Sequence, residues 1–137
     1  MRFIDSTIFL CLMLRQPKEY FEGCKKLILR IQTGKELCGT TIITMAEIIW
    51  VLESRENWTK AKVLDKVAAL HALRGLQLLE IENKDTPLEA MTLAQKFNTD
   101  FADALTALTM NHHRIKEIYS LDTHFDHFNF IKRTTPT

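Results

Sequence analysis

Short apolar runs alternate with amphipathic segments along almost the whole chain, and this alternation limits the possible folds more than any other feature. The apolar runs, at 1–4, 37–43, 76–81 and 115–121, have the length of buried strands. The segments between them repeat apolar residues every three or four positions, which is the period of a helix with one buried face. Strands that alternate with helices form a parallel sheet through right-handed crossovers. The sequence therefore predicts an α/β fold around a short parallel sheet of four to five strands.

Capping and stop residues set the expected bounds of the helices. Helices are predicted at about 6–15, 17–33, 44–56, 59–74, 87–97 and 100–109. The helix at 44–56 is expected to begin at Thr44, because Thr44-x-x-Glu47 has the form of a capping box, with Ile43 and Ile48 placed to form a hydrophobic staple. A single helical turn is expected at 122–126 and a short edge strand at 128–131. Residues 1–132 are predicted to form one domain, followed by a polar tail at 133–137.

The composition excludes several classes of protein. Lys and Arg number 18 and Asp and Glu 17, so a binder that depends on bulk positive charge is excluded, although RNA remains a possible substrate. The three cysteines form no Cys-x-x-Cys pair and have no histidine at zinc-ligand spacing. We therefore expect neither a disulfide framework nor a zinc site. The expected location is reducing and cytoplasmic. No run approaches the ~20 apolar residues of a membrane-spanning helix, so no membrane association is expected.

Four acidic residues fall where predicted strands end or predicted helices begin. Asp5 ends the first strand, Glu47 lies one turn beyond the second, Asp103 lies in the first turn of a helix, and Asp122 ends the fourth strand. Each alone is explained as a helix cap, because acids accept hydrogen bonds from free N–H groups at helix starts. In a parallel sheet, however, the carboxyl ends of all strands lie at one edge. The four acids are therefore expected to converge.

Convergence of carboxylates is unfavourable unless a cation compensates it. Like charges within ~4–6 Å raise one another's pKa, and burial adds to this effect. Oxygen ligands without cysteine favour Mg²⁺ or Mn²⁺ over zinc or copper. Such ions can activate water and neutralise charge on a phosphodiester during in-line displacement. The pattern of acids therefore indicates phosphodiester hydrolysis.

Four short segments resemble the four acidic motifs of PIN-domain ribonucleases, in the order in which that family carries them: Phe3-Ile4-Asp5-Ser6, Thr44-x-x-Glu47, Asp103-Ala104-Leu105-Thr106-Ala107 and Ser120-Leu121-Asp122-Thr123-His124-Phe125. The motifs span nearly the whole chain. Its size and lack of extra domains resemble the VapC-like toxins of type II toxin–antitoxin pairs. The resemblance implies a three-layer α/β/α fold, Mg²⁺ or Mn²⁺ dependence, endonucleolytic cleavage of RNA, a homodimer, and neutralisation by a cognate antitoxin.

The resemblance also assigns roles to individual residues. Asp5, Glu47, Asp103 and Asp122 fall on the family's catalytic and metal-binding positions. Four auxiliary residues have roles that the sequence leaves open. Ser6 and Ser120 match hydroxyl positions that can hold a water or a carboxylate, Asp100 either shares the role of Asp103 or caps its helix, and Asp126 is either an outer ligand or a surface acid.

Two other functions are compatible with parts of the pattern. A non-catalytic PIN-like module could use the same edge, or its helices, to bind RNA or a protein. A receiver domain phosphorylated on Asp5 is a weaker alternative, because the chain has no acidic pair near its N-terminus.

Several other residues have expectations of their own. The histidines at 112, 113, 124 and 127 are expected to be exposed or at a polar rim, and the alternative is that His124 or His127 contacts phosphate. Trp50 and Trp58 are expected to serve as core or staple residues, with Trp58 the better interface candidate. Basic residues outnumber acidic ones 12 to 8 in residues 1–74, against 6 to 9 in the remainder. This distribution is compatible with a basic rim around an acidic pit.

Overall fold

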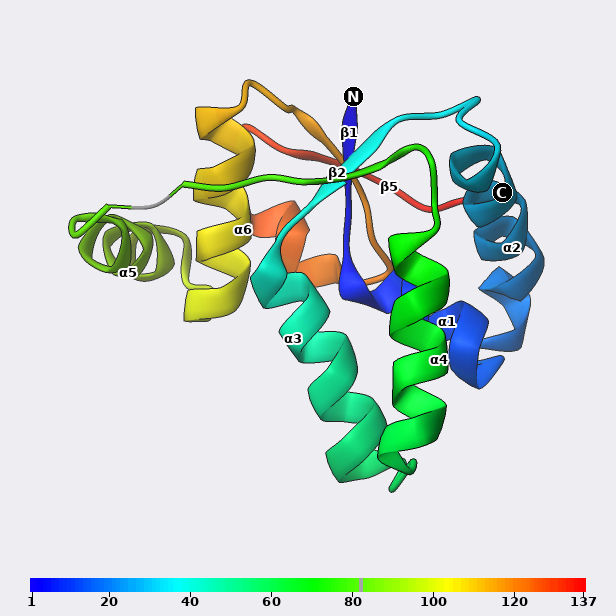
Figure 1. Ribbon diagram of the computed structural model, residues 1–137. Coiled ribbons are helices and arrows are strands. Elements are labelled where there is room, and N and C mark those ends of the chain that lie inside the picture. Colours follow the sequence, from blue (N-terminus) through cyan, green and yellow to red (C-terminus); the bar gives the residue numbers. More distant parts are fainter. Residues whose placement is uncertain (82) are drawn as a thin grey trace.

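A five-stranded parallel sheet forms the centre of the computed structural model, which describes residues 1–81 and 83–137 (Figure 1). The strand order is β3-β2-β1-β4-β5, and every neighbouring pair is parallel. The strands span Arg2–Ile4 (β1), Cys38–Thr40 (β2), Leu76–Leu78 (β3), Glu117–Tyr119 (β4) and Lys132–Thr134 (β5). The predicted parallel α/β architecture is confirmed.

Six α-helices among the described residues flank this sheet. They span Ser6–Leu14 (α1), Lys18–Gln32 (α2), Ile42–Trp50 (α3), Lys60–His71 (α4), Thr86–Phe97 (α5) and Phe101–His112 (α6). A π-helical turn at Val51–Arg55 (η1) continues α3, and a 3-10 turn at Thr123–His127 (η2) follows β4. Figure 1 shows α1, α2 and α4 on one side of β1 and α5 and α6 on the other. The fold thus has three layers.

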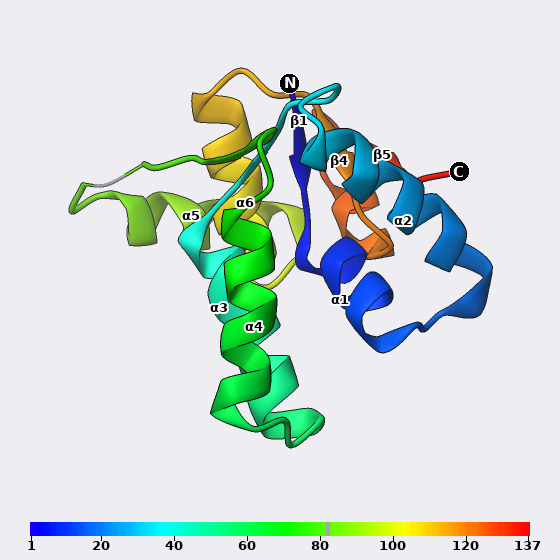
Figure 2. The same ribbon diagram turned by 45° about the vertical axis from the view of Figure 1, so that its right-hand side comes forward.

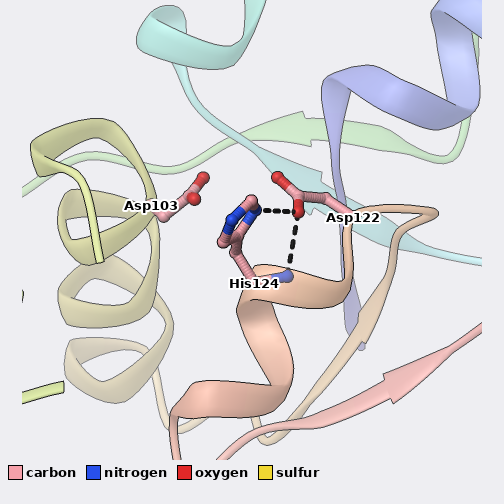
Figure 3. A group of neighbouring side chains, drawn as sticks. All are labelled: Asp103, Asp122 and His124. Carbon is pink, nitrogen blue, oxygen red and sulfur yellow. Dashed lines mark hydrogen bonds and ion pairs between the residues drawn. The ribbon is translucent and has the colours of Figure 1, made fainter. Parts of the chain in front are cut away.

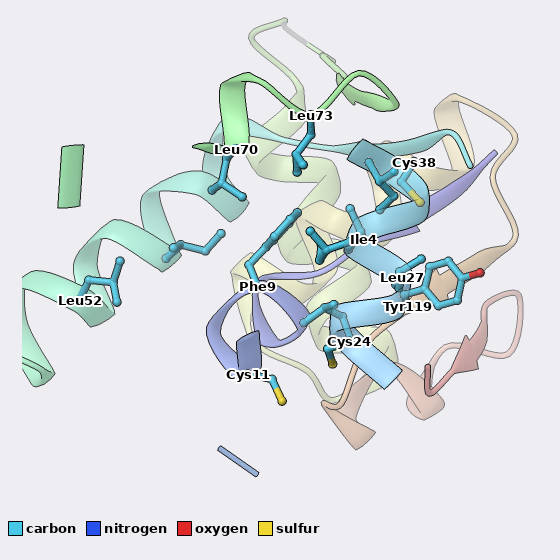
Figure 4. Close-up of a cluster of buried hydrophobic side chains, with 14 of the residues drawn as sticks. Ile4, Phe9, Cys11, Cys24, Leu27, Cys38, Leu52, Leu70, Leu73 and Tyr119 are labelled. Atoms are coloured by element: carbon cyan, nitrogen blue, oxygen red, sulfur yellow. The ribbon is translucent and has the colours of Figure 1, made fainter. Parts of the chain in front are cut away.

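The two faces of the sheet bury two separate apolar clusters. Side chains alternate between the faces of a strand, and in β1 Phe3 joins one cluster while Ile4 joins the other. The cluster around Ile4 contains Phe9, Leu27 and Leu70 from α1, α2 and α4 (Figure 4). The cluster around Phe3 contains side chains from α5 and α6. A strand buried on both faces must be apolar throughout, which explains the short apolar runs in the sequence.

The helix that carries Glu47 begins earlier than the capping-box pattern predicts. Thr41 is the N-cap of α3, and its Oγ1 accepts a hydrogen bond from the Thr44 backbone N–H at 3.2 Å. The predicted start at Thr44 is therefore wrong, and so is the staple between Ile43 and Ile48, because Ile43 already lies inside the helix. The β-branched residues at 42 and 43 belong to α3 and not to β2. Glu47 consequently lies in the second turn of α3.

The last strand lies further along the chain than expected. The edge strand predicted at 128–131 is wrong: β5 spans Lys132–Thr134 and pairs with β4. Phe128 and Phe130 instead pack against Phe97 of α5, with ring centroids 5.4 and 5.7 Å from its ring. Because aromatic packing holds this segment against α5, it does not extend along the sheet. The sheet therefore includes two residues of the segment predicted to be a polar tail.

The three cysteines, Cys11, Cys24 and Cys38, are buried and form no disulfide among the described residues. Burial raises the pKa of the thiols of Cys24 and Cys38 to about 12. Both therefore remain protonated at neutral pH and act as small apolar side chains in the core. No helix among the described residues is long and apolar enough to cross a membrane.

Candidate active site

A pocket of about 530 Å³ opens at the carboxyl edge of the sheet, between α3 and α6. The register of the sheet aligns the strand ends at this edge: the Asp5 N–H donates to the Tyr119 carbonyl at 3.0 Å, directly after β1 and β4. The acidic residues that line the pocket come from three segments distant in sequence: Glu47, Asp100, Asp103 and Asp122. The predicted convergence of acids at one edge is therefore observed.

Asp5 lies beneath these acids and is almost completely buried, with 5% of its surface exposed. Its Oδ2 accepts hydrogen bonds from Ser120 Oγ at 2.7 Å and from Thr7 Oγ1 at 2.9 Å. Burial raises the pKa of Asp5, and these hydroxyl donors partly oppose that increase. The two hydroxyls therefore hold the carboxylate in one orientation at the end of β1.

Thr7 is a site residue that the sequence interpretation missed. Besides its bond to Asp5, its Oγ1 accepts a hydrogen bond from the Leu121 backbone N–H at 2.9 Å, which connects α1 to the segment after β4. In the sequence Thr7 belongs to the polar cluster 5–7, which resembles an ordinary helix cap. A hydroxyl two residues after a strand-ending aspartate is the only local signal. Its partner at position 121 is recognisable only in the folded chain.

Ser6 connects the buried acid to the pocket. Its Oγ donates to Glu47 Oε2 at 3.0 Å and lies 3.5 Å from Asp5 Oδ1. The predicted role of Ser6 as a hydroxyl that holds a carboxylate agrees with this position. Burial raises the pKa of Glu47, and the charges of Asp5, Asp100 and Asp122 raise it further. No lysine or arginine among the described residues forms an ion pair with Glu47.

Among the acids that line the pocket, Asp103 has the pKa that is shifted most strongly. Burial, followed by the charge of Asp100 and then that of Asp122, raises its pKa from an ordinary 3.8 to about 7. Asp100 is the N-cap of α6, and its Oδ1 accepts a hydrogen bond from the Asp103 N–H at 2.8 Å. Asp100 therefore caps the helix and also lines the pocket, so the two roles considered for it are compatible. The acids repel one another, and no lysine or arginine among the described residues forms an ion pair with Asp100 or Asp103, which is the electrostatic state that a cation would relieve.

Asp122 and His124 approach Asp103 from the opposite side (Figure 3). Asp122 Oδ1 accepts a hydrogen bond from the His124 backbone N–H at 2.9 Å and lies 2.7 Å from Nδ1 of the His124 ring. This contact raises the pKa of His124. Each of the three residues offers one potential ligand atom, and these atoms lie within 4.8 Å of one another. Two carboxylate oxygens and one imidazole nitrogen form a donor set that fits a divalent cation.

The remaining residues with sequence-based expectations are distributed as follows. Asp126 lies outside the pocket, and its two oxygens accept hydrogen bonds from Arg133 at 3.0 and 3.1 Å. All four histidines considered above are exposed, as expected, although His124 also belongs to the cluster in Figure 3. Trp58 packs against the core, whereas Trp50 is 56% exposed and lines the pocket. The expected core role is therefore confirmed for Trp58 and wrong for Trp50.

The raised pKa of Asp103 predicts how the stability of the metal-free protein depends on pH. An acid whose folded pKa is raised stabilises the fold fully below its unfolded pKa, and this contribution is lost as pH rises through the folded value. Because Asp103 is partly exposed, solvent screening leaves about 1–2 kcal/mol of the roughly 4 kcal/mol that such a shift represents. We expect the free energy of unfolding in urea with EDTA to fall between pH 4 and 7. Asp103→Asn should reduce this slope.

The matched control for this measurement is Asp65→Asn, which alters an exposed acid of α4. That variant should keep the full slope of the parent protein. Asp5 and Glu47 titrate in the same direction, so part of the slope should survive in Asp103→Asn. Equal slopes in the parent and Asp103→Asn would show that the acids do not interact as the structure indicates.

Comparison with known proteins is consistent with this geometry. The crystal structure of VapC20 from Mycobacterium tuberculosis, a toxin that cleaves the sarcin–ricin loop, matches with a TM-score of 0.73 and 16% identity, covering 96% of this chain and 97% of that one. The structure of PAE2754 from Pyrobaculum aerophilum matches with a TM-score of 0.57 and 16% identity, covering 96% and 87%. At these identities the likeness is one of fold. No curated protein matches the sequence.

The match to a protein family is more specific than the likeness of fold, because it is a match of the sequence itself. The model of the PIN domain matches residues 2–131, a segment that begins before Asp5 and ends after Asp122 and therefore includes all four acidic motifs. On this match, the chain belongs to the PIN domain family.

Proposed function

We propose that this protein is a metal-dependent endoribonuclease that hydrolyses RNA and acts as the toxin of a type II toxin–antitoxin pair. The observation that carries the proposal is the convergence of Glu47, Asp103 and Asp122 on one pocket, above the buried Asp5, from four segments distant in sequence. Membership of the PIN family and the fold of the VapC20 toxin support it. The proposed partners are an RNA substrate, a cognate antitoxin and a second copy of the chain, in the cytoplasm.

The four acids are the proposed ligands of Mg²⁺ or Mn²⁺, with His124 beside them. A cation bound there would neutralise charge on the phosphate and lower the pKa of a water molecule. Mutual repulsion of Asp103 and its acidic neighbours, expressed in the raised pKa of Asp103, supports this assignment. The presence of an imidazole in the cluster is better suited to Mn²⁺ than to Mg²⁺, because Mg²⁺ prefers oxygen ligands.

The protein's own residues would position the reactants and move a proton. Ser120 and Thr7 hold Asp5, and Ser6 holds Glu47 Oε2, so the other oxygen of Glu47, Oε1, is the proposed acceptor of a proton from the attacking water. The water oxygen bonds to phosphorus as the bond to the 3′-oxygen breaks, and that oxygen takes a proton from solvent. The products are 5′-phosphate and 3′-hydroxyl ends.

Cleavage and metal binding together test the enzymatic proposal. We expect the purified protein to cleave RNA with Mn²⁺ or Mg²⁺ and to be inactive in EDTA. Titration calorimetry should detect Mn²⁺ binding that weakens at least about tenfold in Glu47→Gln, as expected for loss of a charged ligand. A protein that binds RNA but neither binds Mn²⁺ nor cleaves would instead be a non-catalytic binding module.

A separate experiment tests the toxin role. Expression of the protein in a bacterial host should arrest growth, and Asp5→Ala should abolish the arrest. Co-expression of the product of an adjacent small gene should restore growth. Active cleavage in vitro without growth arrest would leave the nuclease proposal intact and contradict the toxin role.

A further inference from the structure

One wall of the acidic pocket carries an exposed tryptophan beneath an arginine. Trp50 ends α3 with 56% of its surface exposed, and the guanidinium carbon of Arg55 lies 5.4 Å from the centre of its ring. Both side chains line the same pocket as Glu47 and Asp103. The segments that carry them, α3 and η1, extend away from the sheet (Figures 1 and 2), and η1 contacts α4. The proposed cleavage mechanism uses neither residue.

A local irregularity of the helix produces this pair. Residues Val51–Arg55 form a π-helical turn, in which the Glu56 N–H donates to the Val51 carbonyl five residues earlier, at 3.1 Å. A π-turn widens the helix through hydrogen bonds between residues five apart, and it is frequent at functional sites. Arg55 is thereby brought over Trp50, on the side of the helix that faces the pocket. A regular α-helix would rotate Arg55 further from Glu47.

The pocket is strongly acidic, so a positively charged side chain at its wall matters for the binding of RNA. Four acids line the pocket, and Arg55 is the only lysine or arginine among the described residues that line it. RNA approaching the acids needs positive charge next to its phosphates. Arginine offers a planar cation that can bind a phosphate while remaining stacked on an aromatic ring. Arg55 therefore lies where a phosphate flanking the scissile bond would be repelled least.

The tryptophan supplies a different property. Ile43 and Val51 also line this wall, so the exposed indole continues an apolar surface beside the acids. Bases stack on exposed aromatic rings, and only an unpaired base has its face available. Trp58 differs in this respect: it packs against the core, with Lys62 Nζ 3.8 Å from its ring centre.

We propose that Trp50 and Arg55 form the RNA-binding wall of the pocket, where an unpaired base stacks on the indole and an adjacent phosphate pairs with the guanidinium. The inference rests on the proposed function, because it assigns the substrate of the same pocket. It specifies single-stranded RNA or a loop as the substrate class. It also divides recognition between a residue that contacts a base and a residue that contacts the backbone.

Binding of a short, fluorescently labelled single-stranded RNA to protein carrying Asp5→Asn separates this inference from cleavage. In that background, Trp50→Ala should weaken binding on the order of tenfold, and Trp50→Phe should restore most of the affinity. Affinity for RNA with one abasic position should fall in the Trp50 protein and not in Trp50→Ala. This difference is specific to stacking, because loss of a merely structural tryptophan would weaken binding to both RNAs equally.

The role of Arg55 has its own readout in the dependence of binding on salt. Arg55→Gln should reduce the slope of log affinity against log salt by about 0.7, the value for one phosphate contact on a single strand. The matched control is Arg15→Gln, because Arg15 is also exposed and lies above an aromatic ring, 5.5 Å from the centre of Phe21, outside this pocket. That control should leave the slope unchanged.

Three results would overturn the inference: unchanged binding in both variants, loss of affinity that does not depend on the base, or conversion of a dimer to a monomer by Trp50→Ala with base dependence intact. The last result would identify this wall as a protein interface. The proposed nuclease activity fails separately. If RNA binding requires Trp50 but the protein shows no Mn²⁺-dependent cleavage, the nuclease proposal is refuted and the inference about the wall stands. If the protein cleaves RNA but the variants bind RNA as the parent does, the nuclease proposal stands and the inference is refuted.

Discussion

Asp5→Asn is expected to reduce metal-dependent cleavage of RNA on the order of a thousandfold, which exceeds the 10- to 100-fold typical of residues that only support a metal ligand. Asp5 lies at the end of the central strand, and its carboxylate is held by Ser120 and Thr7. An amide has nearly the same shape and no negative charge. The substitution therefore removes the negative charge that would bind a cation, and it leaves the hydroxyl groups of Ser120 and Thr7 in place. Initial rates of RNA cleavage with Mn²⁺ measure this effect.

The stability of the same variant distinguishes loss of chemistry from loss of fold. Burial raises the pKa of Asp5, so its charge opposes folding in the absence of metal. Asp5→Asn should therefore melt no lower than the parent protein in EDTA. Asp65→Asn, at an exposed position of α4, should retain full cleavage. Substantial cleavage by Asp5→Asn would exclude Asp5 from the catalytic site.

Gly75→Ala is expected to destabilise the fold by about 3 kcal/mol, a large part of the 5–15 kcal/mol by which domains are typically stable. A methyl group at Gly75 would collide with the Glu36 carbonyl oxygen and lie 2.9 Å from that of Ile31. Both obstacles are backbone atoms, so no side-chain rotation can relieve the contact. The Gly75 N–H also donates to the Ile31 carbonyl at 2.8 Å, which fixes the end of α2 beside the start of β3. Urea unfolding measures the loss.

Gly39→Ala provides the matched comparison. A methyl group at Gly39 would collide with the buried Leu79 side chain, whose atoms can shift more easily than the backbone atoms around Gly75. The loss of stability should therefore be smaller than in Gly75→Ala. The reverse order would contradict the close backbone contact at Gly75.

The acidic site was predictable because each of its parts is a local pattern joined by one topological rule. Asp5 and Asp122 follow short apolar runs, and a parallel sheet places such positions at one edge. The cap of α6 at Asp100 and the helix that begins near Pro87 also followed from local signals. These features need no knowledge of which distant segments pack together.

The wrong bounds of α3 and of β5 fall where two neighbouring segments of the sequence fit the same element equally well. Thr41 and Thr44 are both plausible helix caps in the sequence, and the chain turns at Thr41 because β2 ends at Thr40 in the sheet. Residues 128–131 are as suitable for a strand as 132–134. The aromatic side chains of that segment pack on Phe97, and the following residues reach β4 instead.

The periodicity of the sequence determined the parallel α/β fold, and the order of its acids determined which residues converge, because both depend on neighbours along the chain. The tertiary structure alone decided that Thr7 supports Asp5, that Arg133 pairs with Asp126, and that Trp50 is exposed at the pocket. Contacts of this kind join residues far apart in sequence or depend on the neighbours that cover a side chain. They arise only when the packed elements bring those groups within hydrogen-bonding or van der Waals distance.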